Sequence, residues 1–151
     1  MKKKILVVVA SLIVLTACSG SRPDLGFDNG ELMPCPETPN CVSSQTDDKE
    51  HYIKPIHFTG TQQEALDNLL RILESEKRTK ILTVEKNYIR VEFTSAVCRF
   101  IDDVEFYFPE QQTAETIIHI RSASRIGKSD LGVNRKRVEQ LRNKFKALYK
   151  E

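Results

Sequence analysis

A dense group of charged and polar residues follows an apolar segment near the C-terminus. Residues 119–137 read HIRSASRIGKSDLGVNRKR and include four arginines, two lysines, three serines and two glycines. Guanidinium groups, hydroxyl groups and the free N–H groups at the start of a helix all favour carboxylates and phosphates as ligands. The sequence therefore predicts a site for an anionic ligand, which is a small molecule, a lipid head group or a cell-wall fragment. The side chains expected to form it are Arg121, Ser122, Ser124, Arg125, Lys128, Ser129 and Arg135.

A structural role for the same residues stays open. Four carboxylates are able to neutralise the arginines: Asp102, Asp103 and Glu105 from elsewhere in the chain, and Asp130 from the segment itself. Because an unpaired charge is costly in a protein core, buried networks of this kind are often part of the scaffold. In this interpretation Asn134 only caps the last helix.

Catalysis has weaker support. An envelope hydrolase would use Asp102 or Asp103, but neighbouring strand residues point to opposite faces, so the two carboxylates cannot act as a pair. The three histidines, His51, His57 and His119, lack the pattern of a catalytic triad. The sequence predicts no cofactor and no metal site, because it has no nucleotide-binding motif and no set of metal ligands. We expect a non-catalytic binding or structural module, with a hydrolase or a protein-interaction module as the alternatives.

Two helices are expected to position these residues. Thr61 and Glu64 form a capping box, and a helix from there to about Glu76 has its apolar side chains on one face. A second helix is expected from Asn134 to Tyr149. Its apolar positions are Val138, Leu141, Phe145 and Leu148.

The segment between the helices is predicted to be rich in β-structure. Residues 80–85 and 88–94 are predicted to form one hairpin, and residues 97–108 and 115–124 another. Residues 52–58, before the first helix, are predicted to add an edge strand. Alternation of apolar residues predicts several cross-strand neighbours in the second hairpin. These are Val104 with Ile120, Phe106 with Ile118, Asp103 with Arg121, Glu105 with His119 and Asp102 with Ser122. The expected architecture is an α+β domain over residues 32–151, with an antiparallel sheet of four to five strands and two helices on one face.

The N-terminus predicts export and membrane attachment. Three lysines precede the apolar run from Ile5 to Ala17, which is shorter than the roughly 20 residues that span a bilayer. The last residues, Leu15-Thr16-Ala17-Cys18, resemble the bacterial lipobox. We therefore expect residues 1–17 to be removed, Cys18 to be lipidated and residues 18–31 to form a tether. An ordinary signal peptide in which Cys18 falls by chance is the alternative.

Location and charge limit the possible partners. Ser19 follows the lipidated cysteine, which in bacteria with two membranes favours the periplasmic face of the outer membrane. Residues 18–151 hold 20 basic and 21 acidic side chains, so the basicity of the whole chain comes from the signal lysines and gives no support for nucleic-acid binding. Basic residues are concentrated in 121–151, where they suit either anionic head groups or the acidic remainder of the chain.

The cysteines fit an oxidising compartment. Cys35 and Cys41 lie in the proline-stiffened segment PCPETPNC and are predicted to form a disulfide. A zinc site is disfavoured because no histidine is near them. Cys98 is predicted to be a small buried residue, in phase with Phe100 on a strand.

Three segments resemble a known family. MPCPETPNCVSS at 33–44, RFIDDVEFYF at 99–108 and IRSASRIGKSDLGVNRKRVEQLR at 120–142 are similar to signature blocks of the domain-of-unknown-function 1499 family, whose members are often exported or membrane-associated. The resemblance implies no particular activity. It draws attention to Asn40, Cys41, Ser43, Ser44, Asp102, Asp103, Arg121, Ser122, Ser124, Arg125, Ser129, Asp130, Asn134 and Arg135.

Overall fold

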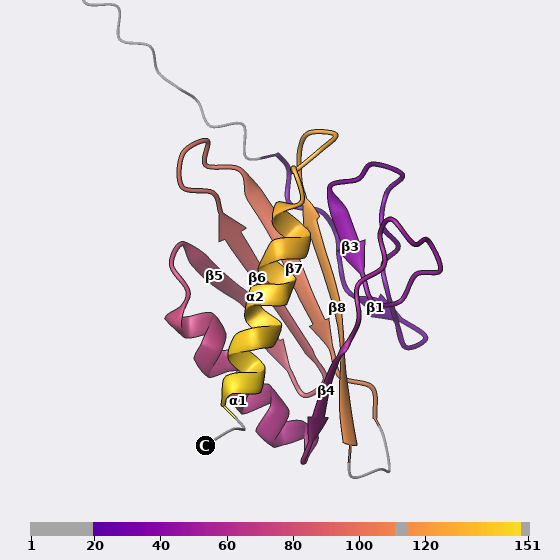
Figure 1. Ribbon diagram of the computed structural model, residues 1–151, viewed down its shortest axis with the longest axis vertical. Coiled ribbons are helices and arrows are strands. Elements are labelled where there is room, and N and C mark those ends of the chain that lie inside the picture. Colours follow the sequence, from indigo (N-terminus) through magenta and orange to yellow (C-terminus); the bar gives the residue numbers. More distant parts are fainter. Residues whose placement is uncertain (1–19, 111–114, 149–151) are drawn as a thin grey trace, which may run out of the picture.

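The computed structural model describes residues 20–110 and 115–148 and has an antiparallel β-sheet with both helices on one face (Figure 1). The elements are β1 (Phe27–Asp28), β2 (Glu31–Leu32), β3 (Cys41–Ser43), β4 (Ile56–Thr59), α1 (Gln62–Ser75), β5 (Thr79–Glu85), β6 (Tyr88–Thr94), β7 (Ile101–Tyr107), β8 (Glu115–Ser124) and α2 (Val133–Ala147). The main sheet has the order β3-β8-β7-β6-β5, and β4 also pairs with β8. The predicted α+β class is confirmed. The sheet has six strands, rather than four to five, because β8 is long enough to pair with β4 along its first half and with β3 near its end.

The two helices begin in different ways. Thr61 caps α1 as predicted: its Oγ1 accepts from the backbone N–H of Glu64, and the Glu64 carboxylate accepts from the backbone N–H of Thr61. At α2 the capping residue is Gly132, with a φ of 77° that favours glycine, and the Asp130 carboxylate accepts from the first free N–H groups. The prediction that Asn134 caps this helix is wrong, since its side chain is bonded elsewhere.

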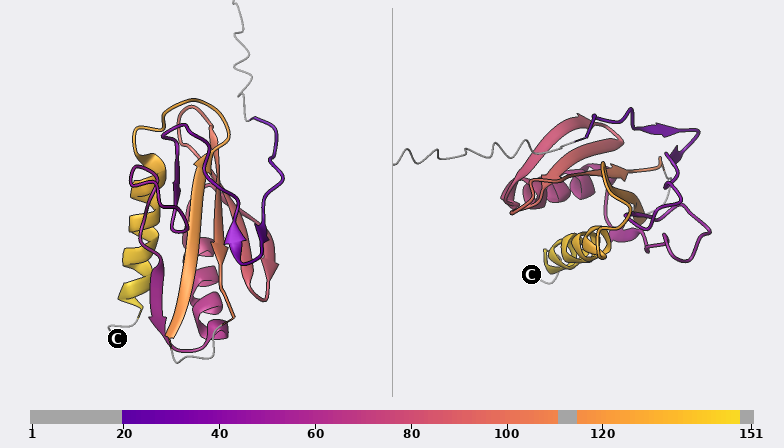
Figure 2. Two further views of the ribbon diagram at one scale, coloured as in Figure 1. Left: turned by 90° about the vertical axis from the view of Figure 1, so that its right-hand side faces the viewer. Right: turned by 90° about the horizontal axis from the view of Figure 1, so that it is seen from above.

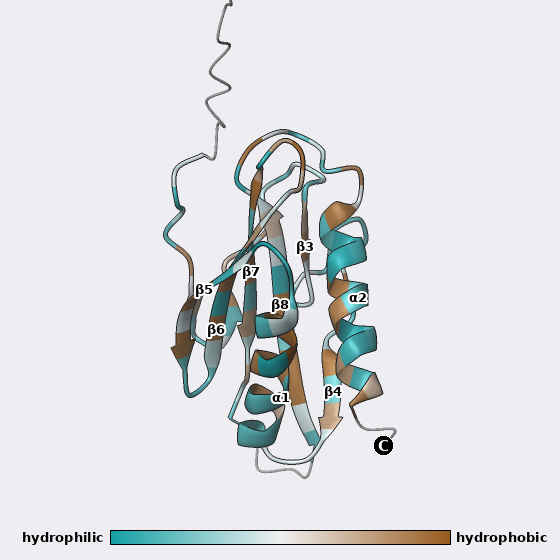
Figure 3. Ribbon diagram, turned by 90° about the vertical axis from the view of Figure 1, so that its left-hand side faces the viewer, coloured by the Kyte–Doolittle hydropathy of each residue, from teal (hydrophilic) through white to brown (hydrophobic). Residues whose placement is uncertain are grey.

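The hydrophobic core lies between the sheet and the helices. Phe106 and Ile120 point into it from paired positions of β7 and β8, and Phe145 of α2 packs edge-on against Phe58 of β4 at 5.9 Å between ring centroids. Complete burial of such a side chain contributes roughly 1.5–3 kcal/mol. Figure 3 shows the opposite character on the exposed side of α1, which is largely hydrophilic. The amphipathic pattern therefore decides which face of each helix meets the sheet.

The register of the second hairpin differs from the prediction by two residues. Phe106 lies opposite Ile120 and Val104 opposite Ser122. The predicted pairs of Val104 with Ile120 and Phe106 with Ile118 are therefore wrong. The predicted polar pairs are wrong in the same way, because the structure pairs Glu105 with Arg121, Asp103 with Ala123, Asp102 with Ser124 and Tyr107 with His119. Side chains repeat every two residues along a strand, so a shift of two keeps every residue on its predicted face.

The strand expected from residue 97 starts only at Ile101. Residues 95–100 form a loop in which Ser95 and Phe100 are bonded to each other and Arg99 has a φ of 59°. That backbone conformation breaks the strand alternation. The prediction that Cys98 is buried beside Phe100 is therefore wrong, because Cys98 is an exposed free thiol and Phe100 is 45% exposed.

The N-terminal part of the described chain covers the outer face of the sheet, opposite α2 (Figure 2). Phe27 stacks on Tyr107 at 4.5 Å between ring centroids, and Leu32 is buried beside them. Gln45 holds this hairpin in place by accepting from the backbone N–H of Leu32 and donating to the carbonyl of Gly30. The described part of the predicted tether therefore packs against the domain.

Two predicted features at the N-terminal end have different outcomes. The disulfide between Cys35 and Cys41 is confirmed, with sulfur atoms 2.02 Å apart. Residues 1–17, Cys18 and Ser19 lie outside the described residues. Between residues 20 and 148, leaving aside 111–114, no helix has the length and apolar character needed to cross a bilayer.

Candidate functional site

A buried network of three arginines and three carboxylates lies on the outer face of the sheet, under the N-terminal segment. Its members are Arg90 and Glu92 of β6, Asp103 and Glu105 of β7, Arg121 of β8 and Arg125 just after β8. Each of these six side chains is less than a tenth exposed. Formal charges balance within the network, as the structural interpretation of the sequence requires.

Asp103 is the centre of the network. Arg90 donates to its Oδ1 through Nε at 3.1 Å and Nη2 at 2.8 Å. Arg125 donates through Nε to Oδ2 at 2.6 Å and through Nη2 to Oδ1 at 2.9 Å. Burial alone would raise the pKa of Asp103, but the hydrogen bonds from Arg125 and Arg90 outweigh it and hold the pKa below its ordinary value. Asp103 is therefore a carboxylate fixed by two cations.

Asp102 points to the opposite face of the sheet, as strand geometry requires. Its Oδ2 accepts from Arg137 Nη2 at 2.5 Å, and the Arg137 guanidinium also lies over the Phe93 ring. The two adjacent aspartates thus belong to separate ion pairs. A hydrolase that uses either of them remains an untested prediction.

Arg121 differs from the other two arginines of the network. Its Nη1 donates to Glu105 Oε2 at 3.0 Å, while Nη2 makes only a 3.5 Å contact with the carbonyl oxygen of Pro34. Among the described residues, its Nε is the one buried side-chain nitrogen or oxygen without a hydrogen-bond partner. Arg90 and Arg125 each use Nε and Nη2 together on Asp103, whereas Arg121 leaves this two-donor edge almost unoccupied.

Glu105 is held in a less polar setting than Asp103. Its carboxylate accepts from the Tyr88 hydroxyl at 2.8 Å and from Arg121, and the residue has no exposed surface. Burial raises the pKa of Glu105, and the attraction of Arg121 and the hydrogen bond from Tyr88 offset this only in part. Protonation of Glu105 would leave Arg121 without a matching negative charge.

A cavity of about 210 Å³ lies beside Arg121. The sheet side of the cavity is lined by residues that include Arg121, Ser124 and Arg125. The opposite side comes from Pro23 and Leu25 of the N-terminal segment and from Pro36 of the disulfide loop. The cavity thus joins polar groups of the sheet to apolar groups of its cover.

The other predicted site residues lie elsewhere. Ser122 is fully buried on the helix-facing side of the sheet, where its hydroxyl lies 2.5 Å from Asn134 Oδ1. Lys128 is exposed on the loop between β8 and α2, and Ser129 accepts from a backbone N–H of that loop. Arg135 donates to the backbone carbonyls of Tyr52 and Glu50, both at 2.7 Å. Only Arg121, Ser124 and Arg125 of the seven therefore line the cavity together.

Several members of the site were not predicted from the sequence. Arg90 and Glu92 alternate with the apolar residues of β6, and this pattern was a usable signal that they share the outer face. Arg137 was not assigned to Asp102, since no local pattern links a helix residue to a distant strand. Asn134 joins α2 to β8 by donating to Ser124 Oγ at 3.0 Å and to the backbone carbonyl of Asn40 at 3.0 Å.

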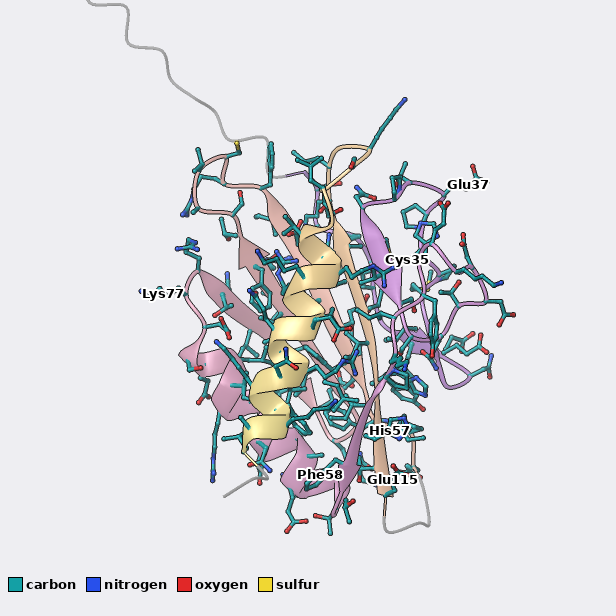
Figure 4. The ribbon with its side chains drawn as sticks, in the orientation of Figure 1. Cys35, Glu37, His57, Phe58, Lys77 and Glu115 are labelled. Carbon is teal, nitrogen blue, oxygen red and sulfur yellow. A yellow bond between two sulfur atoms is a disulfide. The ribbon has the colours of Figure 1, made fainter. Side chains whose placement is uncertain are left out.

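The remaining histidines and cysteines do not gather into a metal centre. Within residues 20–110 and 115–148, no group of three or more histidine, cysteine, aspartate or glutamate side chains is placed to hold a metal ion. Figure 4 shows Cys35 beside β3, and His57 and Glu115 toward the opposite end of β8. His57 Nδ1 lies 2.9 Å from Glu115 Oε1 at an exposed position.

The fold and the site together define an α+β domain whose outer sheet face holds a buried ion-pair network under a disulfide-braced N-terminal segment. The chain belongs to the family described as "Protein of unknown function (DUF1499)", which matches residues 31–145. The matched range extends from β2 into α2, so the predicted family resemblance is confirmed. A comparison with curated proteins finds no match.

Proposed function

We propose that the protein is a lipoprotein of the bacterial cell envelope whose domain is a non-catalytic module that binds a small carboxylate or phosphate. The anchor is the lipidated Cys18, and in bacteria with two membranes the protein faces the periplasm from the outer membrane. The ligand occupies the cavity beside Arg121. The observation that carries the binding proposal is the buried Nε of Arg121, which has no hydrogen-bond partner and lies next to Nη2, whose contact with the Pro34 carbonyl is long at 3.5 Å.

Guanidinium chemistry supports an anionic ligand. A carboxylate or phosphate accepts two parallel hydrogen bonds from the Nε–Nη2 edge of arginine, as Asp103 does from Arg125. A buried donor without a partner costs about 1–3 kcal/mol, and a ligand oxygen at Arg121 Nε would remove that cost. The weak contact with the Pro34 carbonyl is the one that the ligand displaces.

The groups around Arg121 place two requirements on the ligand. Glu105 is the carboxylate that pairs with Arg121. The pKa of Glu105 is raised whereas the pKa of Asp103 is lowered, so Glu105 takes up a proton more readily than Asp103. When Glu105 is protonated, an anionic ligand supplies the negative charge that Arg121 then lacks. Pro23 and Leu25 line the opposite wall, so the ligand has a short apolar part next to its anionic group.

Binding is tested by thermal unfolding with sodium phosphate and with sodium butyrate as probes. A bound ligand at 100 times its Kd stabilises the native state by about 2.7 kcal/mol, which raises the Tm by several degrees. Arg121→Lys keeps the charge near Glu105 but lacks the two-donor edge, so its Tm is expected not to respond. Arg135→Lys is the matched control and is expected to respond like the wild type, because Arg135 lies outside the cavity.

A second measurement avoids dependence on a variant. The Nε–H resonance of Arg121 in the wild-type protein is expected to move as either probe is added, since a new acceptor changes the shielding of that proton. An unchanged resonance together with an unchanged Tm would count against binding and would favour a purely structural network.

The anchor is tested separately. Mass spectrometry of the mature protein is expected to find an acylated N-terminal Cys18, and Cys18→Ser is expected to release the protein from the membrane fraction. Recovery of the wild-type protein in the soluble fraction with a free N-terminus would contradict the anchor without affecting the anion site.

A further inference from the structure

One end of the domain carries an unusual concentration of exposed apolar side chains. The loop of residues 95–100 and the loop of residues 125–132 lie at the end where the described chain begins (Figure 1). Leu131 is 95% exposed and Val97 is 88% exposed, and Phe100 and Val133 are each nearly half exposed. No other large apolar residue of the described chain exceeds 48%. The two most exposed apolar side chains therefore belong to loops at one end of the domain.

The start of the described chain touches one of these loops. A Cβ atom at Gly20 would lie 2.9 Å from Ile126 Cγ2 and 3.0 Å from Arg125 Cβ. An apolar crevice of about 170 Å³ next to this contact is lined by Phe100, Ile126 and Val133, among others, and connects the two loops. Gly20 and both loops thus form a continuous surface.

The charges at this end suit an anionic surface. Arg99 and Lys128 are exposed in the same two loops as Val97 and Leu131. The carboxylate in the second loop, Asp130, already accepts from backbone N–H groups at the start of α2. Exposed apolar side chains flanked by cationic side chains are typical of protein surfaces that bind at the boundary between lipid head groups and acyl chains.

We propose that the tips of these two loops, Val97 and Leu131, insert into the head-group region of the membrane that holds Cys18. This inference rests on the lipid anchor of the proposed function. Cys18 lies two residues before Gly20, and two residues span at most about 7 Å. The loop of residues 125–132, which touches Gly20, is therefore held at the bilayer surface, together with the loop of residues 95–100 across the crevice. The bilayer is the partner, and the domain stands on it with the C-terminal end of α2 pointing away.

Tryptophan fluorescence tests this orientation because the chain contains no tryptophan. Leu131→Trp and Leu148→Trp each add one fluorophore to the full lipidated protein, at exposed leucines near opposite ends of α2. The protein is reconstituted in vesicles of phosphatidylethanolamine and phosphatidylglycerol, with or without brominated acyl chains as quenchers. The tryptophan of Leu131→Trp is expected to emit at a shorter wavelength in vesicles than the tryptophan of Leu148→Trp. The brominated lipids are expected to quench roughly half or more of the emission of Leu131→Trp and to leave the emission of Leu148→Trp unchanged.

Three outcomes would overturn the inference, and each has a distinct meaning. A protein that floats with the vesicles while both tryptophans stay unquenched retains its anchor but has free loops. A blue shift of Leu131→Trp without bromine quenching places the loop against protein instead of lipid. Failure of the wild type to float with the vesicles would contradict the lipid anchor and therefore this inference, and it would leave the anion site to its own test.

Val97→Trp gives a second probe of the same surface if Leu131→Trp does not fold.

Discussion

Arg125 holds both oxygens of the Asp103 carboxylate, with Nε 2.6 Å from Oδ2 and Nη2 2.9 Å from Oδ1. Arg90 donates to the same carboxylate from β6, so one aspartate fastens three consecutive parts of the sheet. Arg90 also donates to the backbone carbonyl of Pro23 at 3.0 Å. The network therefore fixes the N-terminal cover as well as the strands beneath it.

Loss of the Asp103 charge is expected to destabilise the domain strongly. Asp103→Asn leaves two buried arginines without their shared carboxylate, which predicts a loss of about 3–5 kcal/mol in the free energy of unfolding. Urea denaturation measures it. Asp67→Asn on the exposed side of α1 is the control, with an expected change within about 0.5 kcal/mol. A loss below about 1 kcal/mol for Asp103→Asn would show that the network contributes little.

The pH dependence of stability is expected to include a contribution from His51. Its Nδ1 lies 2.9 Å from Asp48 Oδ2 and its Nε2 3.1 Å from the carbonyl oxygen of Thr38, so both ring nitrogens face acceptors and both must donate. The hydrogen bond to Asp48 therefore raises the pKa of His51 despite its burial. A raised folded pKa gives stability that is fully present below the unfolded pKa, about 6.5, and that is lost as the pH rises through the folded value.

Paired denaturation curves test this contribution. The stability difference between the wild type and His51→Gln is expected to be largest near pH 5 and to shrink toward about pH 9. His57→Gln, at an exposed position beside Glu115, is the control and is expected to change stability little. A difference independent of pH would mean that the pKa of His51 is the same in the folded and the unfolded protein.

The disulfide is expected to make a moderate contribution. Cys35 and Cys41 are only six residues apart, so the closed loop is short and the chain-entropy model gives about 2 kcal/mol for its loss in a double serine variant. Cys98→Ser is the matched control, because that thiol is free and exposed, and its effect is expected to be within about 0.5 kcal/mol. Equal effects of the two changes on the urea midpoint would contradict the expectation.

Asn134 is expected to be the most sensitive polar residue of α2. Its amide donates to Asn40 and Ser124, and its Oδ1 accepts from the Ser122 hydroxyl and from Arg137. Asn134→Ala leaves several buried groups without partners, which predicts a loss of about 2–4 kcal/mol.

Asn143→Ala, an exposed change on the same helix, is the control for Asn134→Ala. Calorimetry is expected to find it neutral or slightly stabilising, because alanine favours helices. A similarly small effect at Asn134 would mean that water replaces its amide.

The sequence by itself determined both helices, the approximate position of strands β4 to β8, the faces of these elements and the family. A period of 3.6 with a capping box defined α1, and a period of 2 defined the strands and showed that Asp102 and Asp103 point to opposite faces. The proline-rich spacing identified the disulfide. These features are local, so a short stretch of chain contains the information for each of them.

The tertiary structure decided the register, the ion-pair partners and the cover of the sheet. A period of 2 assigns a face but does not distinguish registers that differ by two residues, so Glu105 meets Arg121 where Asp103 was expected. Arg137 and Asp102 are 35 residues apart in the chain, and Arg22 and Glu92 are 70 apart. Such pairs form only where the packing of whole elements brings the two side chains together. The attraction between opposite charges depends on their distance in space and not on their separation in the sequence. For this reason the unpaired Nε of Arg121 became apparent only in the folded protein.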